Sequence, residues 1–252
     1  MRFDIITLFP ELFAPFLASG VTRRAYAGGQ VDLRLWNPRD YADGNYRRVD
    51  DRPFGGGPGM VMMAEPLARC LAAIRVERGE AESSEAPLVL FSPIGETLNH
   101  AAVERWSAST GAILLCGRYE GIDQRFIDTH VDLQMSLGDF VLSGGEIAAM
   151  ALLDAVARLQ PGVLNDEGSH QFDSFNPALD GLLDCPHYTR PEEWAGQQVP
   201  AALMSGHHAQ IERWRRDQRL ATTARHRPDL IEAARKAGHL AAADEAVLAK
   251  LS

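Results

Sequence analysis

Short apolar runs alternate with helical patterns over residues 1–160, and this alternation constrains the fold more than any other feature. The runs have the length and continuous hydrophobicity of strands that are buried on both faces of a sheet. Such an alternation predicts an α/β domain built on a parallel sheet. The predicted strands are Phe3–Leu8, Val31–Trp36, Pro87–Phe91 and Ala112–Cys116. The predicted helices are Pro66–Val76, Asn99–Ser107, with Asn99 as the N-cap, and Gly145–Arg158.

The pattern changes after residue 160. Residues 161–184 are polar and rich in turn signals, such as Asn176-Pro177, and they are interpreted as a linker that is at least partly mobile. Residues 185–252 are rich in arginine and show helical spacing without a strand pattern, so we expect a small all-α domain there. Its predicted helices are Gly206–Leu220, Asp229–Ala237 and Ala242–Leu251.

Composition excludes several classes of protein. The net charge of −9 argues against nonspecific coating of nucleic acid, although it leaves room for a local basic surface. No apolar run is long enough to span a bilayer, and the N-terminus lacks the features of a signal peptide, so we expect no membrane partner and a cytoplasmic location. The only lysines are Lys236 and Lys250, and neither is near a glycine-rich loop, which excludes a Walker-type phosphate site.

The three cysteines are odd in number and far apart, so neither a disulfide framework nor a zinc site is expected. Cys116 ends an apolar run and is interpreted as a buried structural thiol, because no neighbouring base would activate it.

Four segments carry the residues that suggest a binding site. They are Arg47–Met63, Phe91–Glu96, Leu115–Asp123 and Met135–Glu146. The last three bear glycine and are predicted to lie near the carboxyl ends of strands, where open α/β sheets bind ligands. Each alone is equally compatible with ordinary turns, and the first is as compatible with a flexible loop as with a phosphate or RNA cradle. Together they favour a crevice lined by main chain.

The chemistry of these loops limits the ligand. Arg118 is the only cation of the last three segments, so an adenosyl sulfonium fits better than a triphosphate, which would require several Lys or Arg partners. A dinucleotide fingerprint is missing after Phe3–Leu8, which argues against a Rossmann-type cofactor site.

Several of these strings also resemble the motifs of one enzyme family. VDDRPFGGGPGMVMM, LCGRYEGID, SLGDFVLSGGE and LLDCPHYTRPEEW are similar to motifs of the bacterial tRNA (guanine-N1)-methyltransferases, which belong to the SPOUT class. MRFDIITLFPELF and MSGHHAQIERWRRDQ match as well, so the resemblance extends in order over nearly the whole chain. Met135 and Phe140 depart from the pattern, in which Trp and Tyr are common, and adenine packing is expected to differ there.

The resemblance implies a homodimer with a SPOUT-type trefoil knot in the sheet domain and S-adenosylmethionine as the methyl donor. It also implies that the substrate is tRNA with a guanosine directly 3′ of the anticodon, at position 37. The residues that it assigns to the donor site are Ser92, Pro93, Gly117, Tyr119, Glu120, Gly121, Ile122, Ser136, Leu137, Gly138, Phe140, Leu142, Gly144 and Gly145.

The same resemblance implies two catalytic residues, Asp173 in the linker and Arg158 at the end of a helix. A carboxylate can remove the proton from N1 of guanine, and a guanidinium can stabilise the charge that moves to O6. Without the resemblance, Asp173 would be interpreted as a solvated residue and Arg158 as an i,i+4 partner of Asp154. The family also implies Mg²⁺ at an unknown site, with Glu120, Asp173 and Asp50 as candidate ligands.

Residues 205–228 carry six arginines against one Glu and one Asp. We expect Arg215, Arg216 and Arg219 to contact tRNA phosphates, the alternative being a solvated helix face. Two other functions remain open: a SPOUT enzyme that methylates ribosomal RNA or a ribose 2′-hydroxyl, and a non-catalytic RNA-binding module. Asp173 with Arg158 argue against the first, and the donor loops argue against the second.

Overall fold

The computed structural model describes residues 1–80, 86–165 and 168–251. Asp166 and Glu167, which belong to the predicted linker, lie outside the described residues. The chain divides into two units, Met1–Leu164 and Asn165–Ser252, and each unit has a hydrophobic core of its own.

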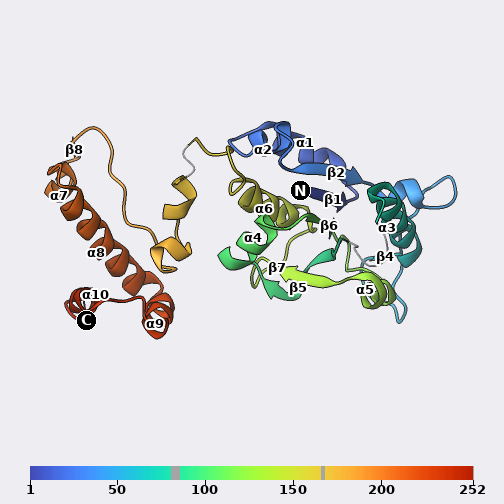
Figure 1. Ribbon diagram of the computed structural model, residues 1–252. Coiled ribbons are helices and arrows are strands. Elements are labelled where there is room, and N and C mark those ends of the chain that lie inside the picture. Colours follow the sequence, from blue (N-terminus) through green and yellow to red (C-terminus); the bar gives the residue numbers. More distant parts are fainter. Residues whose placement is uncertain (81–85, 166–167, 252) are drawn as a thin grey trace. The chain divides into compact units, whose positions relative to one another are not determined.

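The first unit contains a five-stranded sheet in the order β2-β1-β6-β5-β7, in which all neighbouring strands are parallel (Figure 1). The strands are β1 (Arg2–Ile6), β2 (Asp32–Trp36), β5 (Leu88–Thr97), β6 (Gly111–Leu115) and β7 (Leu133–Ser136). The predicted parallel α/β sheet is therefore confirmed. Strand β7 was not predicted, because this short edge strand leaves Leu133 48% exposed and so lacks a continuous apolar run.

Side chains of the central strand alternate between two cores. On β6, Ala112 and Leu114 face one core, while Ile113 and Leu115 face the other. The first core is covered by α1 (Phe13–Ala18), α2 (Arg23–Ala27), α4 (His100–Ser107) and α6 (Glu146–Ala157). The second is covered by α3 (Ala64–Arg78) and α5 (Gln124–His130), so the sheet lies between two helical layers (Figure 1). The unit also contains the 3-10 turns η1 (Pro10–Leu12) and η2 (Pro38–Tyr41) and the hairpin strands β3 (Asp50–Asp51) and β4 (Val61–Met62).

The boundaries of two of the predicted helices agree with the sequence, and for one of them a capping side chain explains the start. The Asn99 side chain accepts a hydrogen bond of 2.9 Å from the Ala102 N–H, which confirms it as the N-cap of α4. Helix α6 begins directly after Gly145 and ends at Arg158, its C-cap. Helices α1, α2 and α5 were not predicted, because five to seven residues are too few to show a helical period.

The second unit is mainly helical. It contains η3 (Ser169–Phe172), η4 (Pro177–Leu179), α7 (Ala201–Met204), α8 (His208–His226), α9 (Pro228–Lys236) and α10 (Ala242–Leu248). It also has an antiparallel pair of two-residue strands, β8 (Glu193–Trp194) and β9 (Gln197–Gln198), so the expectation of a purely α domain was wrong at this hairpin. Pairs this short carry no sequence pattern. Leu182, within the predicted linker, is fully buried in the helical core.

All three cysteines are unpaired and buried. Burial raises the pKa of Cys70 to about 12, and it also raises the pKa of the Cys116 and Cys185 thiols. The interpretation of Cys116 as a buried structural thiol agrees with this environment. Over the described ranges, no helix has the length and hydrophobicity needed to cross a membrane.

Candidate donor-binding and catalytic site

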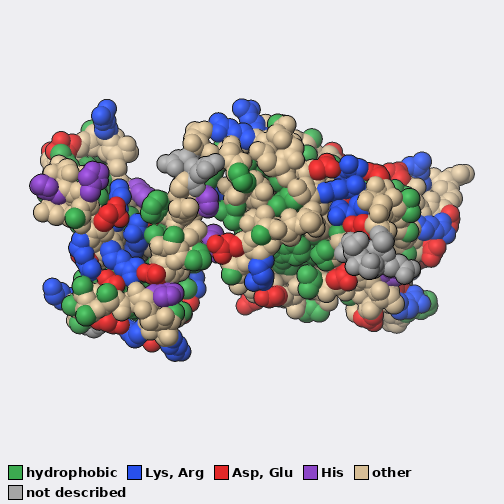
Figure 2. Space-filling view, in the orientation of Figure 1, with side chains coloured by type: hydrophobic (Ala, Val, Ile, Leu, Met, Phe, Trp, Pro, Cys, Tyr) green, Lys and Arg blue, Asp and Glu red, His purple; other side chains and the backbone are tan. Residues whose placement is uncertain are grey.

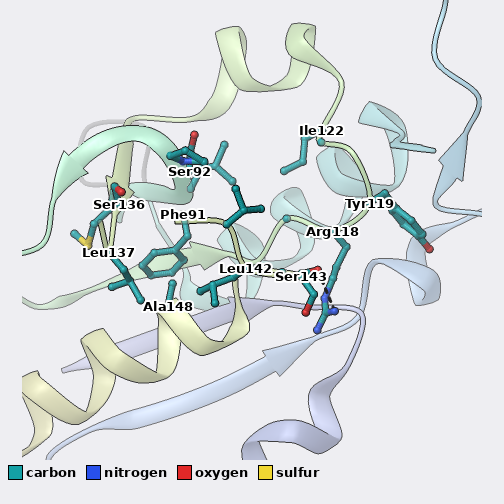
Figure 3. Close-up of a pocket in the computed structure, with 18 of the residues that line it drawn as sticks. Phe91, Ser92, Arg118, Tyr119, Ile122, Ser136, Leu137, Leu142, Ser143 and Ala148 are labelled. Atoms are coloured by element: carbon teal, nitrogen blue, oxygen red, sulfur yellow. Dashed lines mark hydrogen bonds between the residues drawn. The ribbon is translucent and has the colours of Figure 1, made fainter. Parts of the chain in front are cut away.

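The carboxyl ends of β5, β6 and β7 surround a pocket of about 300 Å³ (Figure 3). Every residue that was predicted for the donor site lines this pocket. A bulge within β5 and the loops that follow β6 and β7 build its walls, so the parallel sheet brings together segments that are far apart in the sequence. The structure adds to the lining Leu90, Phe91, Arg118, Ile127, Met135, Val141, Ser143 and Ala148.

The first wall is an irregular part of β5. Pairing with β7 shifts register between Phe91 and Glu96, and Ser92 and Pro93 lie in the resulting bulge at the pocket. Gly95 makes this path possible, since a Cβ there would lie 2.3 Å from the Met135 backbone nitrogen. The bulge therefore depends on glycine at one position.

The second wall, Gly117–Ile122, is held by main-chain bonds to the β3–β4 hairpin. The Glu120 N–H donates to the Met60 carbonyl at 3.0 Å, and the Met62 N–H donates to the Gly121 carbonyl at 2.9 Å. Tyr119 takes a positive φ of 62°, and burial raises the pKa of its phenol. The remaining segment singled out in the sequence, Arg47–Met63, thus supports this wall through its C-terminal end.

The third wall, Ser136–Gly145, leads into α6. The Ser136 hydroxyl accepts a hydrogen bond of 3.1 Å from the Gly138 N–H, which closes a tight turn after β7. At the other end, the Gly145 N–H donates to the Gly117 carbonyl at 3.1 Å. Gly145 must lack a side chain, because a Cβ would lie 2.7 Å from Cα of Cys116. The second and third walls are therefore in direct main-chain contact.

A buried ion pair, which the sequence did not suggest, lies behind these two walls. The Arg118 Nε donates to Glu146 Oε1 at 3.1 Å and is 3.0 Å from Oε2. The Thr7 hydroxyl also donates to Oε1, at 2.9 Å, whereas Oε2 is buried and accepts no hydrogen bond from the described residues. The Glu146 side chain is 1% exposed and that of Arg118 is 20% exposed. Twenty-eight residues separate the two in sequence, so no local motif could have revealed the pair.

The two residues predicted to be catalytic lie outside the lining of this pocket. Arg158 is the C-cap of α6, and thirteen residues of helix at about 1.5 Å each place it roughly 20 Å from Gly145. Asp173 belongs to the second unit, where it follows η3. The adjacent Ser174 hydroxyl accepts a bond of 2.9 Å from the Asp184 N–H, so this part of the predicted linker is tied to the helical unit.

Two of the three α8 arginines that were expected to contact phosphate are paired with carboxylates of their own unit. Arg219 is buried, with Nε 3.4 Å from Asp184 Oδ1, so its predicted contact with phosphate was wrong. Arg216 pairs with Asp180 at 2.7 Å and with the buried Asp244 at 3.0 Å. Figure 2 shows blue basic and red acidic side chains interspersed over the helical unit. These two arginines therefore hold α8 against other segments of the helical unit.

Metal ligands do not gather in the described ranges, where no group of three or more His, Cys, Asp or Glu side chains is arranged to hold an ion. Of the candidate magnesium ligands, Asp50 and Glu120 are near the second wall, since both neighbour Tyr119, and Asp173 is in the other unit. These positions do not make a complete site within either unit.

The sheet and its pocket define an α/β protein that can take a small organic ligand at the carboxyl ends of its strands. A family model described as "tRNA (Guanine-1)-methyltransferase TrmD" matches residues 1–233, and the chain belongs to this family.

Relatives from several bacteria match the whole length. A protein of Paracidovorax citrulli named tRNA (guanine-N(1)-)-methyltransferase is 81% identical over 252 residues, which cover 100% of this chain and 99% of the relative. Proteins of the same name from Polaromonas sp. and Bordetella pertussis are 76% and 57% identical, and each match covers 100% of this chain and 97% or 98% of the relative.

Proposed function

We propose that this protein transfers a methyl group from S-adenosylmethionine to N1 of the guanosine that follows the anticodon of tRNA, at position 37. Family membership and the names of the relatives support the reaction class and the tRNA substrate. The observation that carries the proposal is the pocket, in which each of the three segments that the resemblance assigns to the donor site forms one wall. A cytoplasmic location accords with this substrate.

The pocket suits an adenosyl sulfonium. Its lining is mostly glycine, apolar side chains and main chain, and its charged lining residues are Arg118 and Glu120. A polyphosphate would require more cations, whereas adenine and ribose are bound by apolar surfaces and peptide groups. When bound, S-adenosylmethionine would supply a methyl group activated by its sulfonium charge.

Asp173 is proposed as the general base and Arg158 as the residue that stabilises O6. Guanine N1 carries a proton, so its lone pair becomes available only as that proton leaves. The Asp173 carboxylate takes this proton while the N1–methyl bond forms and the sulfur–methyl bond breaks. The Arg158 guanidinium then faces the charge that develops on O6. Binding of tRNA would bring the Asp173 segment to the reacting base.

A homodimer is part of the proposal, and two features support it. Apolar side chains on α6 and in the preceding loop are exposed, with Ile147 at 57% and Val141 at 86%. Arg158 is roughly 20 Å of helix away from the pocket end of its own α6, so a second copy with an antiparallel α6 would bring an Arg158 toward each pocket.

The trefoil knot is likewise proposed from the family resemblance. The hydrogen bond between Gly145 N–H and the Gly117 carbonyl supports it, because the segment that enters α6 passes against the loop after β6. For Mg²⁺, the described residues of one chain offer no complete ligand set, and no step is assigned to the ion.

Mass spectrometry of the nucleosides from tRNA incubated with the protein and S-adenosylmethionine tests the function. We expect 1-methylguanosine at position 37, and none with tRNA that carries adenosine there. A 2′-O-methylated nucleoside, or methylation of ribosomal RNA alone, would indicate a different RNA methyltransferase. Binding of tRNA without any methylated product would indicate an RNA-binding module.

A further inference from the structure

The Arg118–Glu146 pair places a cation and its counter-charge in the wall of the pocket. Arg118 is the cation of the pocket lining, and the other charged lining residue, Glu120, is exposed. Figure 3 shows Arg118 beside Ser143, where the second and third walls meet. A guanidinium in this wall would repel any ligand that is itself positively charged.

We propose that Glu146 neutralises Arg118 so that the wall of the pocket does not disfavour the sulfonium cation of the donor relative to its neutral thioether product. This inference rests on the proposed function, in which S-adenosylmethionine is the donor. The donor and its product, S-adenosylhomocysteine, share adenosine and amino acid groups. They differ in one methyl group and one positive charge at sulfur, so an uncompensated charge in the wall would change their relative affinities, whereas a neutralised wall does not.

The geometry fixes the pair in place. The Arg118 guanidinium carbon lies 4.4 Å from the centre of the Phe9 ring, and Nη1 donates to the Ser143 carbonyl at 3.2 Å. Gly144 leaves the space that Arg118 occupies, because a Cβ there would lie 2.2 Å from Nε. With Glu146 held by Thr7, neither charge can turn away from the wall without losing several contacts.

Burial makes the cancellation effective. Glu146 is screened from water, so its interaction with Arg118 occurs at a lower effective dielectric constant than that of an exposed pair. Removing one charge would leave the other uncompensated beside the ligand. The two single replacements should therefore shift the preference between donor and product in opposite directions.

Isothermal titration calorimetry on the full chain, with S-adenosylmethionine and S-adenosylhomocysteine at low salt, tests the inference. The Glu146→Gln variant keeps the shape and leaves Arg118 charged, so the ratio of donor Kd to product Kd should rise about tenfold. Arg118→Met should lower this ratio, and the double variant should return it to the wild-type value. Glu104→Gln, on α4, where the side chain is 42% exposed, makes the same charge change away from the pocket and should leave the ratio unaltered.

A purely structural role would weaken both ligands by the same factor, and a constant ratio in folded Glu146→Gln would overturn the inference. If that variant does not fold, Arg118→Met and the double variant decide, since equal ratios in these two would also contradict it. A wild-type protein that binds neither ligand would instead overturn the donor assignment, and this inference with it.

Discussion

Asp173 and Arg158 carry the proton chemistry of the proposed reaction, and the first can be tested by a change of one atom. Asp173→Asn keeps the shape of the side chain but removes its basicity, so methylation in a single turnover with saturating tRNA should fall roughly a hundredfold or more. The affinity for S-adenosylmethionine should stay the same, because Asp173 is not among the residues that line the pocket. A rate near that of the wild type would mean that another base acts, and Glu120 would be the next residue to replace.

Residues inside a motif were easier to predict than the contacts between motifs. The glycines at 117, 144 and 145 stood out in the sequence, and all three line the pocket. The sequence did not show why two of them must be glycine. A Cβ at position 144 would collide with the Arg118 side chain, and a Cβ at position 145 would collide with the backbone of Cys116. Such close approaches arise between segments that only the folded sheet brings together.

At the scale of elements, α8 shows how a charge pattern can mislead. Six arginines between residues 205 and 228 predicted a phosphate-binding face. Arg216 and Arg219 instead donate hydrogen bonds to the carboxylates of Asp180, Asp184 and Asp244. These partners are 28 to 36 residues away in the sequence, so a helical pattern within α8 could not reveal them. By contrast, four of the five strands of the sheet were predictable, because burial on both faces requires a continuous apolar run.

The exposed arginines of α8, Arg215 and Arg225, remain available for a test with tRNA. Replacing both with alanine should weaken tRNA binding and reduce the salt dependence by up to about two ion contacts. Filter binding over a range of salt concentrations measures the slope, with Arg34 and Arg105 of the first unit replaced together as the matched control. A slope equal to that of the wild type would show that this face does not contact phosphate.

The same helix predicts an acid sensitivity. Burial is the largest influence on Asp244 and opposes its ionisation, but the hydrogen bonds from Arg216 and the Ala241 N–H, together with the charges of Arg216 and Arg213, outweigh it and lower the pKa of that carboxyl. A pKa that is lowered on folding stabilises the helical unit above the unfolded value of about 4, and this stabilisation is lost as the pH falls through the folded pKa. Urea unfolding at a series of pH values, followed by circular dichroism, should show this loss of stability.

In this measurement Asp244→Asn should be destabilised at pH 7, and it should lose less stability than the wild type between pH 7 and pH 3. Asp229→Asn, in an exposed pair with Arg227, serves as the control and should change stability by less than about 1 kcal/mol. An acid response of Asp244→Asn identical to that of the wild type would exclude this origin.

At the scale of the whole molecule, the proposed dimer makes a prediction that a monomer cannot satisfy. Chains with Arg158→Ala and chains with Gly145→Val should each be inactive, the latter because a side chain at position 145 meets Cys116. If Arg158 acts on the pocket of the partner, random exchange of subunits should restore about a quarter of the wild-type rate. Mixing followed by a methylation assay measures this, and no recovery after proven exchange would place Arg158 and its pocket in the same chain.

The overall topology was the least predictable level. Alternation of strands and helices predicts a parallel sheet, but nothing in periodicity or composition indicates the knot that we propose, which general folding rules make improbable. The order β2-β1-β6-β5-β7 depends on which strand edges meet, and this is decided by contacts such as those of Gly95 with the backbone of β7.

The burial of all three thiols has a practical consequence for following motion in solution. The thiolate is the nucleophile that attacks a thiol-reactive dye, and burial keeps these sulfurs protonated and out of reach. A cysteine introduced in place of Phe54, whose side chain is fully exposed at the tip of the glycine-rich loop, would therefore take up a maleimide fluorophore selectively. A second one at Phe172, which is 54% exposed beside Asp173, would allow energy transfer to test whether the distance between the two units changes when tRNA binds.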